Sequence, residues 1–219
     1  MIVAIAELFC LQVALGTVLA LFLVRISDME WKFFRLNIVI VSVLLALGYL
    51  LHRPAPGSNF FGLWGASESV LGAKILALIS GGFACGVTLV AMNVGHWYLS
   101  ATKLSIRPLR SVTLGLAVVL SFRLIWLALM VPILARTTPQ VEMDLGRFLR
   151  LEEMTLMTIG ITRILFGLVG PLLLTYLTWQ SVKIHSTQSA TGILYALLAM
   201  ILVGEACATF ITLTTSIPA

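Results

Sequence analysis

Six long apolar stretches constrain the fold of this 219-residue chain more than any other feature. A helix needs about 20 apolar residues to cross the hydrocarbon core of a bilayer. Charged residues make up only 11% of the chain, whereas an ordinary soluble domain has about 25%. The sequence therefore predicts an all-α, polytopic transmembrane helical bundle that forms one integral membrane domain over residues 1–219. The predicted spans are residues 2–24, 36–52, 75–99, 112–134, 154–177 and 192–214.

The connections between these stretches differ in charge. Connections after the first, third and fifth stretches carry seven Lys or Arg residues, and those after the second and fourth carry five. Cytoplasmic loops are enriched in Lys and Arg. The bias predicts a multi-pass protein of the cell membrane with both termini on the outer side. No Lys or Arg precedes Arg25, so the first stretch lacks the basic start of a signal peptide and is expected to be a retained span.

Three local patterns qualify the six spans. The second span is the shortest, and we expect it to face lipid. Residues 141–153 intersperse apolar and charged side chains, which predicts a short amphipathic helix lying on the membrane between the fourth and fifth spans. Gly82 and Gly86 form a small-residue packing motif in the third span. Gly167, Gly170 and Pro171 are expected to weaken or kink the fifth.

Four ionisable residues fall inside the apolar spans. Even on the lenient insertion scale, a charged residue at a helix centre costs about 2.5–3.5 kcal/mol. We therefore expect these residues to face inward and to neutralise one another in the outer half of the bundle, with an arginine bridging to Glu205. The predicted buried charge network consists of Glu7, Arg123, Arg163 and Glu205. It can be a structural network that sets helix register, or a site in which arginines hold an anion and Glu205 takes up a proton.

A second polar group ends the third span at its basic side. Asn93 and His96 share a helix face at positions i and i+3, and Trp97 and Tyr98 follow them. One interpretation is an aromatic and basic membrane anchor, because Trp and Tyr are common at interfaces. The other is a pocket for a quinone or a lipid head group, in which His96 hydrogen-bonds a carbonyl oxygen and exchanges a proton near neutral pH.

The sequence argues against several other kinds of site. Cys10, Cys85 and Cys207 all lie in apolar runs, and no C-x-x-C pattern is present, so no metal site is predicted. A bis-histidine haem needs two histidines at one depth on facing helices, and His52, His96 and His185 supply no such pair. No basic run is dense enough for nucleic acid, and no complete catalytic motif is present, so no catalytic residue is assigned.

The pair Gly204-Glu205 in the last span is similar to a pair in the quinol-interacting membrane anchors of molybdenum oxidoreductase complexes. That resemblance implies a quinone-linked function. The arginine that often follows the pair in those anchors is absent here, where the next residues are Ala206, Cys207, Ala208 and Thr209.

Three hypotheses for function follow. The first is a membrane subunit of a quinone-linked, respiratory-type electron-transfer complex, which would need other subunits because it carries no redox centre and would not be catalytic alone. The second is a small-solute or proton-coupled anion transporter, in which Arg123 and Arg163 bind the anion and Glu205 carries the proton. The third is an accessory or assembly subunit without a site.

Overall fold

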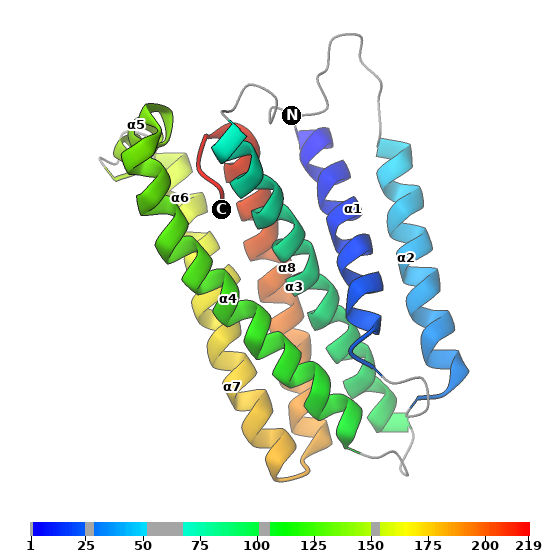
Figure 1. The fold of residues 1–219 in the computed structure, drawn as a ribbon. Coiled ribbons are helices and arrows are strands. Elements are labelled where there is room, and N and C mark those ends of the chain that lie inside the picture. The colour runs from blue at the N-terminus through cyan, green and yellow to red at the C-terminus, as the bar shows by residue number, and fades with distance from the viewer. Residues whose placement is uncertain (1, 25–28, 52–67, 101–105, 150–153) are drawn as a thin grey trace.

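The chain forms a helical bundle in which successive long helices run in alternating directions (Figure 1). The computed structural model describes residues 2–24, 29–51, 68–100, 106–149 and 154–219, and these ranges contain helices and no strands. The helices are α1 (Ile2–Leu21), α2 (Trp31–Leu51), α3 (Glu68–Ser100), α4 (Arg107–Thr137), α5 (Pro139–Leu149), α6 (Met154–Ile164), the π-helix η2 (Leu165–Val169), α7 (Gly170–Lys183) and α8 (Thr187–Thr214). The predicted all-α bundle is confirmed.

Five of the described helical segments are long and apolar enough to cross a membrane. They are Trp31–Leu51, Val70–Leu99, Arg107–Thr137, Met154–Lys183 and Thr187–Thr214. The first predicted span corresponds to α1, whose apolar part Ile5–Leu21 is shorter. The count of six spans therefore stays a prediction. The predicted surface helix overlaps α5, but residues 150–153 lie outside the described residues and the contact of α5 with a membrane is untested.

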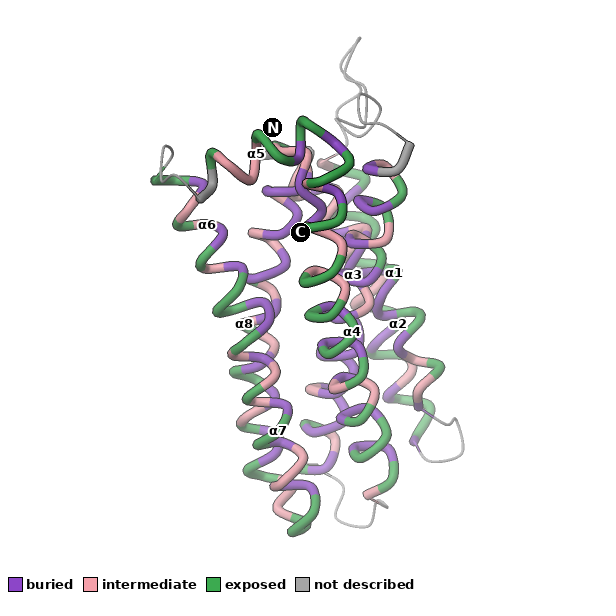
Figure 2. Tube along the Cα trace, turned by 60° about the vertical axis from the view of Figure 1, so that its left-hand side comes forward, coloured by how far each residue is buried: buried purple, intermediate pink, exposed green. Residues whose placement is uncertain are grey.

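Apolar side chains cover much of the outer surface of the bundle. Figure 2 shows exposed residues along the outward faces of the helices and buried residues toward the interior. Phe22, Leu50 and Val118 are 85%, 75% and 62% exposed. Large apolar patches on a protein surface indicate an apolar environment or a partner. Together with the five long apolar helices, this surface identifies a membrane protein.

Helix α3 lies at the centre of the bundle and contacts α1, α2, α4 and α8. Its close approach to α1 depends on glycine. A Cβ on Gly82 would overlap the backbone of Gln12, and a Cβ on Gly86 would overlap the backbone of Gly16. The predicted small-residue motif is therefore a packing face, and its partner is α1.

The fifth predicted span is interrupted where Gly167, Gly170 and Pro171 were expected to weaken it. The π-helix Leu165–Val169 separates α6 from α7, and the Gly170 N–H donates to the Leu165 carbonyl five residues earlier. Pro171 has no N–H to continue the α-helical ladder, so the chain inserts one wider turn before it. Such π-helical turns often lie at functional sites.

Gly82→Ala and Gly86→Ala should each lower the stability of the protein. An added methyl group must separate α3 from the α1 backbone, and overpacking of this kind costs about 1–3 kcal/mol. The measurement is the midpoint of thermal unfolding in mild detergent. Gly72→Ala is the matched control, because a Cβ at Gly72 on the same helix meets no atom within 4 Å. A midpoint unchanged in all three variants would contradict the assigned packing face.

Candidate functional site

The ion cluster in the middle of the bundle joins three helices. Arg123 Nη2 of α4 lies 2.8 Å from Glu205 Oε2 of α8. Arg163 Nη1 of α6 lies 3.2 Å from Glu205 Oε1. Each of the three residues is only 2% exposed. We call Arg123, Arg163 and Glu205 the buried triad.

Two arginines share one carboxylate in the buried triad, so the formal charge of the three groups is +1. Arg123 has further acceptors on α3, where its Nη1 donates to the carbonyl oxygen of Ala77 and to the hydroxyl of Ser80, both at 3.1 Å. Arg163 is less well paired. Within the described ranges its Nε and Nη2 find no hydrogen-bond acceptor, although both atoms are buried. Leaving a buried charged donor unpaired costs more than the ~1–3 kcal/mol of a neutral one.

Glycines make the space that the buried triad occupies. A Cβ on Gly81 of α3 would collide with Glu205 Oε2 and approach Arg123 Nη1 to 2.7 Å. A Cβ on Gly167 of the π-helix would collide with Arg163 Nη1, and one on Gly204 would collide with the Gly167 backbone. From the sequence, Gly167 is predicted only to weaken its helix, and Gly81 is not predicted to have a role. In the sequence, Gly167 lies four residues after Arg163 and Gly204 lies directly before Glu205, whereas no such proximity points to Gly81.

The structure brings together three of the four residues in the predicted charge network. Gln12 Nε2 of α1 donates to Thr209 Oγ1 of α8 at 3.0 Å, which places these two residues at one level of the bundle. The two helices run in opposite directions (Figure 1). Glu7 is therefore nine residues, or about 13 Å, from the level of Glu205. Glu7 is buried near the end of the bundle that holds the N-terminus.

A polar cavity opens above the buried triad, on the side of the two termini. Its volume is about 450 Å³. Phe210 lines it five residues beyond Glu205 on α8, and Leu156 lines it seven residues before Arg163 on α6. At 1.5 Å per residue the cavity lies about 8–10 Å from the triad along these two helices. We call it the vestibule; its other lining residues are Asp144, Arg147, Thr155, Thr214 and Thr215.

The four residues of the predicted head-group pocket do not point into one space. Asn93 is buried and its Nδ2 donates to Asn37 Oδ1 of α2 at 3.0 Å. Trp97 packs edge-to-face on Phe33 of α2, with ring centroids 6.3 Å apart. Tyr98 is buried in the apolar core. His96 is exposed, and its Nδ1 lies 3.0 Å from the hydroxyl of Tyr195 on α8.

These contacts correct the expected role of the second span. Phe33 and Asn37 are fully buried, so α2 joins the bundle through its basic end as well as facing lipid. Asn37 was missed because one asparagine in an apolar run carries little signal without its partner. Among the described residues no three His, Cys, Asp or Glu side chains form a group that could hold a metal ion.

Replacing Glu205 by Gln should destabilise the protein strongly. The variant leaves two arginines buried without a counter-charge, and breaking a buried ion pair from one side costs about 3–5 kcal/mol. Thermal unfolding in mild detergent measures the effect. Glu142→Gln, at an exposed position on α5, is the control and should leave the midpoint in place. If both variants unfold at the wild-type temperature, Glu205 does not hold the triad together.

No protein-family model, no curated protein and no solved structure matches this chain. The similarity to quinol-interacting membrane anchors therefore rests on Gly204 and Glu205 alone. A functional conclusion therefore depends on the geometry of the buried triad, the vestibule and the His96–Tyr195 pair.

Proposed function

We propose that this chain is a membrane transporter that binds a small anion at the buried triad and couples its movement to a proton. The observation that carries the proposal is the unequal charge of the triad, in which two buried arginines face one glutamate. Each uncompensated buried charge is costly, so the surplus positive charge of the triad favours a bound anion. An anion bound beside Arg163 removes that cost.

The unpaired groups of Arg163 support the choice of ligand. Nε and Nη2 form the planar fork with which a guanidinium binds carboxylate or phosphate oxygens in pairs. The π-helix directly after Arg163 widens the backbone where α6 and α8 approach. The vestibule supports an entry route, because it opens between the same two helices; its wall carries Arg147 and Asp144, whose Oδ1 lies 3.9 Å from Arg147 Nη1.

Glu205 is the proton carrier in this proposal. When an anion neutralises Arg163, Glu205 keeps Arg123 as its counter-charge and the cluster has no net charge. Protonation of Glu205 leaves a net charge of +1 when the anion is bound and of +2 when it is absent, so the bound anion favours proton uptake and the two are expected to bind together. Both termini and the vestibule lie on the outer side of the cell membrane in this scheme, because Lys32, Arg35 and Arg107 gather at the other end.

Purified protein in liposomes should accelerate uptake of at least one anion from a panel of chloride, acetate, lactate and phosphate. An inwardly directed proton gradient should increase the rate. Arg163→Met should lower uptake about tenfold or more, because one hydrogen bond to a charged group is worth about 1.5–3 kcal/mol. Its thermal stability should be kept, since Glu205 retains Arg123.

Arg136→Met is the matched control, because the substitution removes the same charge from the chain at an exposed position near the end of α4. It should transport like the wild type. Uptake no faster than in protein-free liposomes for every anion would overturn the transport proposal. Equal uptake by Arg163→Met and wild type would remove the buried triad from the binding site.

A second candidate function is the quinone-linked membrane subunit, and the His96–Tyr195 pair favours it. Both side chains are exposed at the surface where a lipid-soluble quinone arrives, and their ring centroids are 6.5 Å apart. Gly192 lies one turn before Tyr195, and a Cβ there would meet no atom within 4 Å. A flat ring can therefore approach α8 beside the pair and accept a hydrogen bond from it. Other subunits would supply the redox centre.

The quinone proposal predicts binding of decylubiquinone or a menaquinone analogue to the purified protein, measured by quenching of tryptophan fluorescence. The double variant His96→Ala, Tyr195→Phe removes the hydrogen-bonding groups and should weaken binding about tenfold. The variant Tyr49→Phe is the control, because Tyr49 is exposed on α2. Two negative results with the wild-type protein would together contradict this function: no binding of either quinone, and no coloured redox partner that co-purifies in mild detergent.

A further inference from the structure

A groove lies between α4 and α7 in the half of the bundle that ends in basic residues. Its volume is about 430 Å³ and its exposed lining is almost entirely apolar. The residues of α4 that line it include Leu114 and Ala117, and those of α7 include Leu172, Tyr176 and Trp179. Leu114 and Tyr176 are 54% and 59% exposed, so the groove is open to the surroundings of the bundle. An apolar groove of this kind accommodates a hydrocarbon chain.

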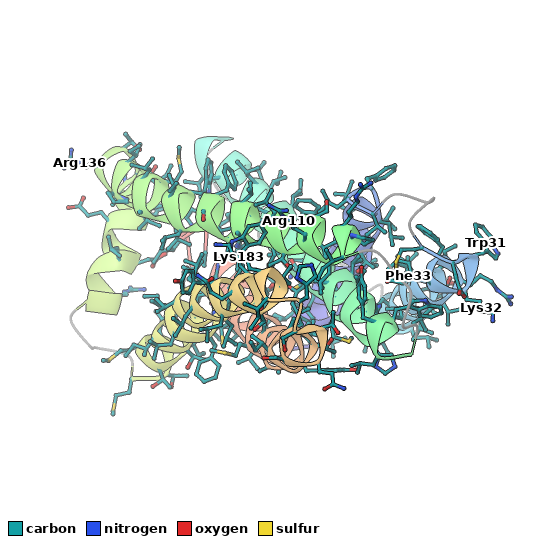
Figure 3. All side chains as sticks on the ribbon, turned by 90° about the horizontal axis from the view of Figure 1, so that it is seen from below. Trp31, Lys32, Phe33, Arg110, Arg136 and Lys183 are labelled. Atoms are coloured by element: carbon teal, nitrogen blue, oxygen red, sulfur yellow. The ribbon has the colours of Figure 1, made fainter. Side chains whose placement is uncertain are left out.

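Two cations stand over one aromatic ring at the basic end of this groove. The Arg110 guanidinium lies 5.4 Å from the centroid of Trp179, and Lys183 Nζ lies 5.8 Å from the same centroid. Arg110 and Lys183 are both exposed. Seen from below, Figure 3 places them close together between α4 and α7. Two like charges held on one ring repel each other, and an anion between them would relieve the repulsion.

A buried hydroxyl completes the groove. Thr175 lines it, is only 2% exposed, and its Oγ1 has no hydrogen-bond partner among the described residues. Threonine hydroxyls on membrane helices commonly donate to the carbonyl oxygen four residues earlier. Thr113, on the opposite wall of the groove, donates in this way to the Leu109 carbonyl oxygen at 2.7 Å. Because Thr175 does not, its hydroxyl is free to bond a polar atom that enters the groove.

These groups follow one another in order along the two helices. On α7, Thr175, Trp179 and Lys183 are spaced four residues apart and so share one face. The distance from Lys183 to Thr175 is about 12 Å along the axis. Moving from the end of the bundle toward its centre, the groove offers cations, then an aromatic ring, then a hydroxyl, and finally apolar walls.

We propose that this groove is a binding site for one anionic glycerophospholipid of the leaflet at the basic end. The phosphate lies between Arg110 and Lys183, the Thr175 hydroxyl donates to an oxygen of the glycerol ester region, and an acyl chain lies along Leu172 and Ala117. Basic pockets between membrane helices on the cytoplasmic side are known to bind such head groups. A free anion would use only the cations and would leave Thr175 and the apolar walls without a role.

Lipid binding by the purified full chain in mild detergent tests the site. Native mass spectrometry and thermal unfolding are measured with dioleoylphosphatidylglycerol and with dioleoylphosphatidylcholine, which has the same acyl chains but no net charge. Phosphatidylglycerol should bind at least about tenfold more tightly and should raise the unfolding midpoint more. The double variant Arg110→Gln, Lys183→Gln should lose that preference. Inorganic phosphate should give no stabilisation.

Thr175→Val separates the lipid site from a structural role. Without lipid this variant should unfold at or above the wild-type temperature, because it removes an unpaired buried hydroxyl. The stabilisation by phosphatidylglycerol should become smaller. Arg136→Gln, at the far end of α4 (Figure 3), should leave both measurements unchanged. Equal binding of the two lipids by the wild type, full stabilisation by inorganic phosphate, or an unaltered lipid preference in the Arg110 and Lys183 double variant would overturn the proposal.

Discussion

The shared carboxylate of Glu205 is the interaction on which the arrangement of the bundle depends. Arg163 comes from α6, which packs on α8, and Arg123 comes from α4, which packs on α3 and α7; both reach the same side chain in an apolar interior. Burying either arginine without it would raise the free energy of the folded state, since an unpaired charge in such a medium is costly. Arg123 also reaches α3 through Ala77 and Ser80. One glutamate thus determines the level at which α3, α4, α6 and α8 meet.

Glycine residues allow these helices to approach one another closely. Lipid tails are as apolar as leucine, so membrane helices associate through close packing and polar contacts and not through the hydrophobic effect. Gly16 and Gly86 bring α1 onto α3, while Gly167 and Gly204 bring the π-helix onto α8. The second contact also leaves room for the Arg163 guanidinium. The same small residues therefore set the distance between helices and the volume of the charged site.

Composition and apolar run length were enough to predict the helical bundle, because a bilayer requires continuous helices and their length is set by its thickness. The same physical cost predicted that Arg123, Arg163 and Glu205 would meet. The partners of each helix face could not be predicted, because they depend on rotation about the helix axes. His96 and Trp97 are neighbours in sequence, yet they contact α8 and α2. Glu7 was grouped with the triad on depth alone, and its level is different.

Other polar contacts of the bundle differ from the buried triad in that each is a single pairing. Gln12 with Thr209, Asn93 with Asn37, and Lys74 Nζ with the Thr215 carbonyl each join two segments through one hydrogen bond. These contacts favour one axial register of the helices, because any other register would leave a polar group unsatisfied in an apolar interior, which is costly. Glu205 already obtains a counter-charge from Arg123. Arg163 adds a second positive charge that register does not require, and this surplus is the physical reason to look for a ligand beside it.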